Sequence, residues 1–183
     1  MKKQILLPLI LCLLSSALYS QLMVSKLIGS GSSKFGLGYG IFTYLDIPRA
    51  SSENQSFRIE LMELAIYPTK GENFFTSTAE GRGYISIKLG YKYVFSETQA
   101  GFYVIPSAGY CRTVFTYPGQ TTLKGDGIAG ALEGGYALEV GQNGHTLNFG
   151  LKYEYDRGGS SLILQSIGFR FSYAFGLFQR HDN

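Results

Sequence analysis

The sequence predicts an all-β fold in which eight antiparallel strands form an up-and-down β-barrel. Three observations support this prediction. Several segments alternate large apolar residues with small or polar ones over about ten positions or more, a period that sends the two classes to opposite faces of a strand. Short and long polar connections follow one another in turn between these segments, and the apolar faces are rich in aromatic residues.

Residues 1–20 have the composition of a secretory signal peptide. Lys2 and Lys3 precede an apolar run, and small residues follow it, with cleavage expected between Ser20 and Gln21. A membrane anchor is the weaker interpretation, because the apolar run is shorter than the ~20 residues that a spanning helix needs. We therefore expect the chain to be exported.

The expected mature domain, 21–183, is nearly neutral. The 16 basic residues of the full chain, less Lys2 and Lys3, leave 14 against 13 acidic residues. Binding to nucleic acid is not predicted, because that function requires a basic patch or stripe. Cys111 is the one cysteine left after cleavage, so no disulfide can form within the chain. No motif indicates a metal or another cofactor.

The segments 22–29 and 34–41 are the first two predicted strands. In the second of them, one face carries only large apolar residues: Phe35, Leu37, Tyr39 and Ile41. The segment 22–29 alternates less regularly, and it is predicted as a strand because barrels of this kind have an even number of strands. The polar stretch 46–54 is expected to form the turn before the third strand.

Two later strands carry an irregularity. In 56–67 the apolar residues change face between Leu61 and Met62, which predicts a β-bulge at that point. In 101–113 the apolar face includes Pro106, and a proline within a ladder removes one hydrogen-bond donor. We expect this strand to be kinked there.

Three segments alternate almost without exception: 84–95, 127–140 and 146–156. Their outward faces are predicted from the large residues, which are Ile85, Ile87, Leu89, Tyr91, Tyr93 and Phe95, then Ile128, Leu132, Tyr136, Leu138 and Val140, then Leu147, Phe149, Leu151, Tyr153 and Tyr155. The connections 96–100 and 141–145 are short, whereas 68–81 and 116–126 are long. This alternation is typical of an up-and-down barrel with unlike rims.

The last predicted strand, 168–175, has aromatic rings on one face and small or polar residues on the other. The first face carries Phe169, Phe171, Tyr173 and Phe175, and the second begins with Gly168 and Arg170. Rings in such numbers are too bulky for the inside of a narrow barrel. The sequence therefore predicts that they contact lipid.

The polar faces of these strands predict a charged lumen. They carry five basic and four acidic residues, namely Arg58, Glu60, Lys88, Lys92, Glu133, Glu139, Lys152, Glu154 and Arg170. The lumen of an eight-stranded barrel is just wide enough for side chains to fill. Buried charges must be paired and hydrogen-bonded, and the near balance of signs allows this.

The pattern over residues 22–176 resembles the small bacterial outer-membrane β-barrel family of the OmpA/OmpX transmembrane type. Its most specific part is the last strand, where Gly168 and the alternating aromatic residues look like the terminal signal read by the barrel-assembly machinery. Members of that family often end on the final aromatic residue, whereas here "GLFQRHDN" continues.

The resemblance implies a monomeric, non-enzymatic protein of the Gram-negative outer membrane. It also implies that both termini are periplasmic, that membrane lipid and the assembly machinery are partners, and that the loops 68–81 and 116–126 carry any binding of an extracellular ligand. A structural or surface-binding role is the function expected of such a protein.

Two other functions are compatible with eight strands. A secreted lipocalin-like carrier would hold an apolar ligand inside the barrel, but the chain lacks the tryptophan that such carriers have near the first strand. A lipid A-modifying barrel enzyme would need a nucleophile near His145, and the position two residues later is Leu147, which no base can activate. A narrow pore is a third, less favoured possibility.

Overall fold

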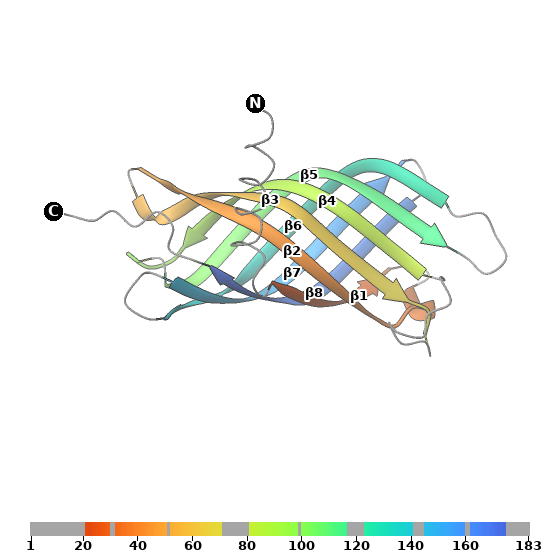
Figure 1. The fold of residues 1–183 in the computed structure, drawn as a ribbon, viewed down its shortest axis with the longest axis horizontal. Helices are drawn as coiled ribbons and strands as arrows, with labels where there is room; N and C mark the ends of the chain where they lie inside the picture. Colours follow the sequence, from red (N-terminus) through yellow and green to blue (C-terminus); the bar gives the residue numbers. More distant parts are fainter. Residues whose placement is uncertain are drawn as a thin grey trace, which may run out of the picture.

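The computed structural model describes residues 21–29, 32–50, 52–70, 81–98, 100–116, 123–140, 145–159 and 162–174. Eight antiparallel strands follow one another around a closed barrel (Figure 1), as the sequence predicted. They are β1 (Leu22–Ile28), β2 (Leu37–Arg49), β3 (Ser52–Pro68), β4 (Gly81–Val94), β5 (Gly101–Thr116), β6 (Leu123–Val140), β7 (His145–Gly158) and β8 (Leu162–Ala174). The 3₁₀ helix η1 (Ser32–Lys34) precedes β2.

Several sequence predictions concern residues outside these described ranges. They are the signal peptide at 1–20, the central parts of the two long connections, most of the turn at 141–145, and Phe175. The predicted first strand at 22–29 is confirmed by β1, whose side chains alternate strictly between exposed and buried.

The two rims of the barrel are distinguished by the chain ends. At the terminal rim β1 begins and β8 ends, and the connections 50–51, 95–100 and 141–144 lie there. At the opposite rim the connections are 29–36, 69–80, 117–122 and 159–161.

The strand register fixes the tilt of the strands. If the directly paired residues are followed around the barrel from Leu22 through β2, β3 and β4, the path reaches Arg112 on β5. In the other direction it leads through β8, β7 and β6 to Phe102 on the same strand. The stagger is thus ten residues (112 − 102). A stagger of about 33 Å over eight strands spaced about 4.8 Å apart gives a tilt of about 41°.

β2 differs from its prediction at both ends. Lys34 belongs to η1, and Phe35 forms an isolated bridge to Thr69 with its side chain buried. The strand continues to Arg49, so the turn predicted at 46–54 is reduced to 50–51. The alternation is hidden because Phe42 and Tyr44 point into the barrel, which makes this part of β2 apolar on both faces.

The bulge predicted in β3 is present. The register with both neighbouring strands shifts between Glu60 and Glu63. Because a one-residue shift reverses every following side chain, Glu60 and Glu63 both face the lumen and are almost fully buried. The bulge therefore supplies the lumen with a second carboxylate.

Pro106 lies on the outward face of β5, and the strand continues through it. The pairing of β4 with β5 passes from Gly90 opposite Ser107 to Tyr93 opposite Val104. On its other side Pro106 pairs with Leu132. The proline thus interrupts one ladder and leaves the register unchanged.

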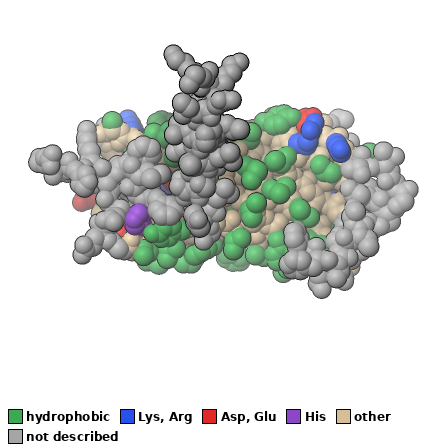
Figure 2. Space-filling model, viewed as in Figure 1, with side chains coloured by type: hydrophobic (Ala, Val, Ile, Leu, Met, Phe, Trp, Pro, Cys, Tyr) green, Lys and Arg blue, Asp and Glu red, His purple; other side chains and the backbone are tan. Residues whose placement is uncertain are grey.

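The barrel is apolar outside and charged inside. Phe169 on β8 is 72% exposed, whereas Arg170, the next residue, is 3% exposed. Figure 2 shows hydrophobic side chains spread over the wall that faces the viewer, with charged side chains toward the two ends. The predicted faces of β4, β6, β7 and β8 hold for the described residues.

Candidate functional site

The lumen contains eight of the nine charged residues predicted to face it. Each of the eight is buried: Arg58, Glu60, Lys88, Lys92, Glu133, Lys152, Glu154 and Arg170. Glu139 departs from the prediction, because it lies one residue before the end of β6, at the terminal rim, and is exposed. It shares the face of the others but extends beyond the closed part of the lumen.

The centre of the lumen is an ion-pair network around Glu63. Lys88 Nζ donates to Glu63 Oε2 at 2.7 Å and to Glu154 Oε1 at 2.5 Å. Lys152 Nζ contacts the same two carboxylates. All four side chains are at most 2% exposed. Two lysines and two glutamates therefore pair with one another in the buried centre of the lumen.

A second group of ion pairs adjoins the first toward the terminal rim. Arg170 Nη1 donates to Glu60 Oε1 at 2.9 Å and to Glu133 Oε2 at 2.6 Å. The Tyr103 hydroxyl donates to the other oxygen of Glu133 at 2.7 Å. The Arg170 guanidinium also lies 3.4 Å from the centre of the Phe42 ring, a cation–π contact that further fixes the side chain.

The third group lies nearest the terminal rim. Arg58 forms a two-pronged pair with Asp46, with both N–O distances at 2.7 Å, the geometry in which guanidinium and carboxylate bind most strongly. Its guanidinium is 3.7 Å from the centre of the Tyr44 ring. Lys92 Nζ donates to Asn148 Oδ1 at 3.2 Å. The charged lumen is thus linked from strand to strand around the barrel.

Three lumen carboxylates were missed by the sequence analysis. Asp46 was assigned to a turn, and Glu63 follows the bulge, which changes its face. Asp156 was not selected either, although it lies on the lumen face of β7 and is 0% exposed. The bulge between Leu61 and Met62 was the one signal that could have revealed Glu63.

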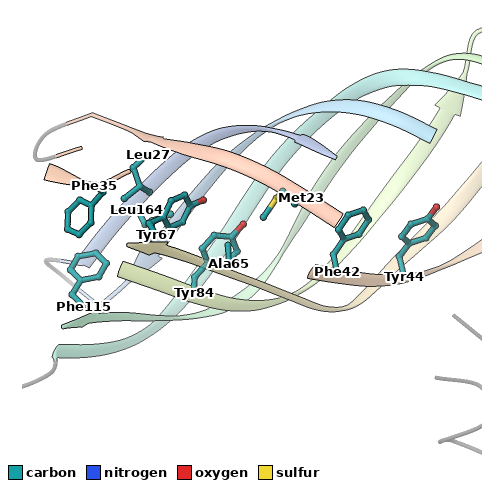
Figure 3. Packing of buried hydrophobic residues seen from close by; sticks show 10 residues of the cluster. All are labelled: Met23, Leu27, Phe35, Phe42, Tyr44, Ala65, Tyr67, Tyr84, Phe115 and Leu164. Carbon is teal, nitrogen blue, oxygen red and sulfur yellow. The ribbon is translucent and has the colours of Figure 1, made fainter. Parts of the chain in front are cut away.

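The opposite rim is filled by apolar and aromatic side chains. In Figure 3, Phe35, Phe115, Leu27 and Leu164 gather at one end of the barrel, and Phe42 and Tyr44 lie farther along the lumen. The Arg82 guanidinium lies 4.6 Å from the ring centre of Phe35 and 4.4 Å from that of Phe115. This end is therefore packed by contacts of a different kind from the centre.

Cys111 lies on the lumen face of β5 and is fully buried. Its thiol donates to the carbonyl oxygen of Ile128 at 3.1 Å. A buried thiol that donates to a carbonyl oxygen serves as a packing residue. Within the described residues, no group of three or more His, Cys, Asp or Glu side chains is arranged to hold a metal ion.

Gly168, at the start of the predicted assembly signal, has a steric role at the seam between β8 and β1. It pairs with Ser25. A Cβ atom at Gly168 would lie 2.3 Å from the Ser25 Cβ and 2.7 Å from the Val24 carbonyl oxygen. The seam can therefore close at this spacing only with glycine at this position. Phe169, Phe171 and Tyr173 project from the other face of β8.

Aromatic residues on the outer wall form pairs across strands near the terminal rim. Phe102 packs edge to face on Tyr136, with ring centres 4.9 Å apart, and Phe57 packs on Tyr91 at 5.4 Å. Phe149 packs on Phe171 at 5.2 Å. Such pairs stabilise neighbouring strands, and here they do so on a surface exposed to the surroundings.

Comparison with known proteins yields no match among protein-family models, curated proteins or solved structures. Among the residues that the structure describes, no helix has the length and apolar character needed to cross a bilayer. The function has to be inferred from the residues and their geometry.

Proposed function

We propose that this chain is an integral outer-membrane β-barrel protein of a Gram-negative bacterium, non-enzymatic, with a structural or surface-binding role. The observation that carries the proposal is the inverted polarity of the barrel. Leu89, Phe102 and Phe169 are each at least 65% exposed, whereas the ion pairs are buried. Monomeric soluble proteins rarely expose so extended an apolar surface, and a bilayer gives it a suitable solvent.

The height of the apolar wall supports a membrane-spanning barrel. On the outward face of β5, Phe102 and Arg112 are ten residues apart, and only uncharged residues lie between them. At about 3.3 Å per residue and a tilt of about 41°, the two residues are about 25 Å apart along the barrel axis. This matches the apolar band of outer-membrane barrels, which is about 25 Å tall.

Aromatic side chains lie at both edges of this band. The paired rings described above are near its terminal edge. Near its other edge, Tyr39, Tyr110 and Tyr155 face outward, and the register places all three about 20 Å from the level of Phe102. Rings with a polar tip favour the headgroup region of a bilayer. Two aromatic girdles are what this function requires.

The lumen favours this proposal over a carrier of apolar ligands or a pore. A lipocalin-like carrier needs an apolar interior, whereas the centre here holds Glu63, Lys88 and Lys152 in mutual contact. The same side chains occupy the space through which solute would pass. The barrel is therefore suited to anchoring loops and strengthening the envelope.

The surroundings of His145 favour a non-enzymatic role. Its ring stacks on Tyr173 of the neighbouring strand, with ring centres 5.7 Å apart. Leu147 shares the outward face of β7 with it. This histidine thus belongs to the aromatic girdle near the terminal rim.

Fractionation and gel mobility test the proposal. The full chain is expected in the outer-membrane fraction, with sheet-rich circular dichroism in detergent and a gel mobility that changes on boiling. Phe169 and its neighbours would then contact lipid. Recovery of a folded protein in the soluble fraction, without detergent, would overturn the proposal.

A further inference from the structure

Four basic side chains form a belt on the outer wall at the opposite rim. This basic belt consists of Lys26 on β1, Arg112 on β5, Lys124 on β6 and Arg157 on β7, all exposed and on the outward face of their strands. The strand register places them about 22 to 33 Å from Phe102 along the barrel axis. They therefore begin where the apolar band ends, next to Tyr110 and Tyr155.

Among the described residues, one acidic side chain, Asp126, accompanies the belt, and it is bound to one member. Arg112 Nε and Nη2 donate to its two carboxylate oxygens at 2.7 and 3.0 Å. Lys26, Lys124 and Arg157 form no ion pair with another described residue. Three positive charges thus remain uncompensated within the described part of this rim.

The terminal rim has a different charge. Among described residues its exposed charges are Arg49, Glu97 and Glu139, one positive and two negative. At the opposite rim, Lys34 and Lys70 on the connections add to the belt. Among the described residues, the outer surface is therefore basic at the opposite rim and not at the terminal rim, so the two edges of the apolar band differ in charge.

We infer that the basic belt binds the phosphate groups of a phosphorylated glycolipid in the outward leaflet of the membrane, with Asp126 restraining Arg112. This inference rests on the proposed function, since it requires a membrane-embedded barrel whose terminal rim is periplasmic. Basic side chains at headgroup depth attract anionic lipid, and guanidinium groups match phosphate geometry. The exposed belt lies directly beyond a tyrosine girdle, so it supplies basic side chains at headgroup depth and guanidinium groups for the phosphates.

The test uses the full chain in phosphatidylcholine nanodiscs that contain a small fraction of bisphosphorylated lipid A or of the same glycolipid without phosphates. Bound glycolipid is counted by native mass spectrometry. We expect retention of the phosphorylated form only. Lys124→Gln with Arg157→Gln should weaken retention about 25-fold, since each basic group near an anionic surface contributes about fivefold.

Two further variants sharpen the test. Asp126→Asn should raise retention severalfold, because it releases Arg112 for phosphate, and a loss of binding in this variant would contradict the assignment. Arg49→Gln removes one positive charge at the other rim and should leave retention unchanged. Equal retention of the two glycolipids, or an unchanged Lys124→Gln/Arg157→Gln variant, would overturn the inference.

Vesicle flotation and the boiling-dependent gel shift separate this inference from the proposed function. A protein that floats and shifts but ignores the phosphates is a membrane barrel without the glycolipid site. A protein that does neither overturns both. Inorganic phosphate, at the same phosphate concentration, is expected not to displace the glycolipid, and displacement would overturn the assignment to a lipid headgroup.

Discussion

Lys88 and Leu89 are neighbours on β4, and they show the difference between the two sides of the barrel wall. Lys88 is 0% exposed and forms ion pairs with three carboxylates, whereas Leu89 is 65% exposed and faces outward. In a soluble protein the burial of such a pair is normally reversed. Ion pairs therefore organise the inside of this barrel, and the medium outside must accept apolar side chains.

The largest expected effect comes from removing a carboxylate that contacts two lysines. Glu63→Gln keeps the side-chain volume but leaves Glu154, with Glu60 farther away, to balance both Lys88 and Lys152. Breaking a buried ion pair on one side costs about 3–5 kcal/mol, because the remaining charge is uncompensated. We expect a loss of this size in the free energy of unfolding, measured by urea titration in lipid vesicles.

Glu139→Gln is the matched control for that variant. It makes the same substitution on the lumen-facing register of β6, at a position that is exposed. Surface substitutions usually change stability by no more than about 0.5 kcal/mol. If the two variants lost equal stability, the buried network would have no special role.

A charge on the outer wall tests the other side of the comparison. The register places Leu89 about 12 Å from the level of Phe102, near the middle of the apolar band. Leu89→Arg should cost about 2–4 kcal/mol, and Phe95→Arg, beyond the terminal edge of the band, about 0–1 kcal/mol. Urea unfolding of both variants in vesicles measures this dependence on depth.

A soluble barrel would respond differently to these two changes. Leu89 and Phe95 are both 65% exposed. In a soluble barrel, arginine at either position would therefore face water, and the two substitutions would lower the free energy of unfolding by similar, small amounts. Equal stability of the two variants would therefore count against a membrane around the barrel wall.

The sequence predicted the strands with regular alternation and lost accuracy where both faces are apolar. Strands β4, β6 and β7 were clear because glycines and charged residues alternate with large apolar residues. The end of β2 was hidden because Phe42 and Tyr44 fill the lumen. The partners of each lumen charge could not be predicted, because Glu63 and Lys152 are brought together by closure of strands 89 residues apart.

Gly168→Ala tests how the wall closes at the β8–β1 seam. An added Cβ would approach the Ser25 Cβ to 2.3 Å, and overpacking of this kind costs about 1–3 kcal/mol. The double variant Gly168→Ala/Ser25→Gly should recover part of the loss, because it removes the closest atom. Folding yield in vesicles, measured by the boiling-dependent gel shift, is expected to follow the same order.

An absence of recovery in the double variant would attribute the loss to the backbone of β1, since the Val24 carbonyl oxygen is also close to that position. A wild-type yield for Gly168→Ala alone would show that the seam can open enough to accept a side chain.

The smallest effect is expected at the opposite rim, where a cation packs between two rings. Arg82→Met keeps a long side chain between Phe35 and Phe115 but removes the charge. Cation–π contacts contribute about 0.5–2 kcal/mol according to exposure, and Arg82 is half-buried, so we expect a loss of about 1 kcal/mol in urea unfolding. Lys34→Met, on exposed η1, serves as the control. A loss as large as that of Glu63→Gln would mean that the rim, like the lumen centre, depends on charge, and the two regions would then differ only in their partners.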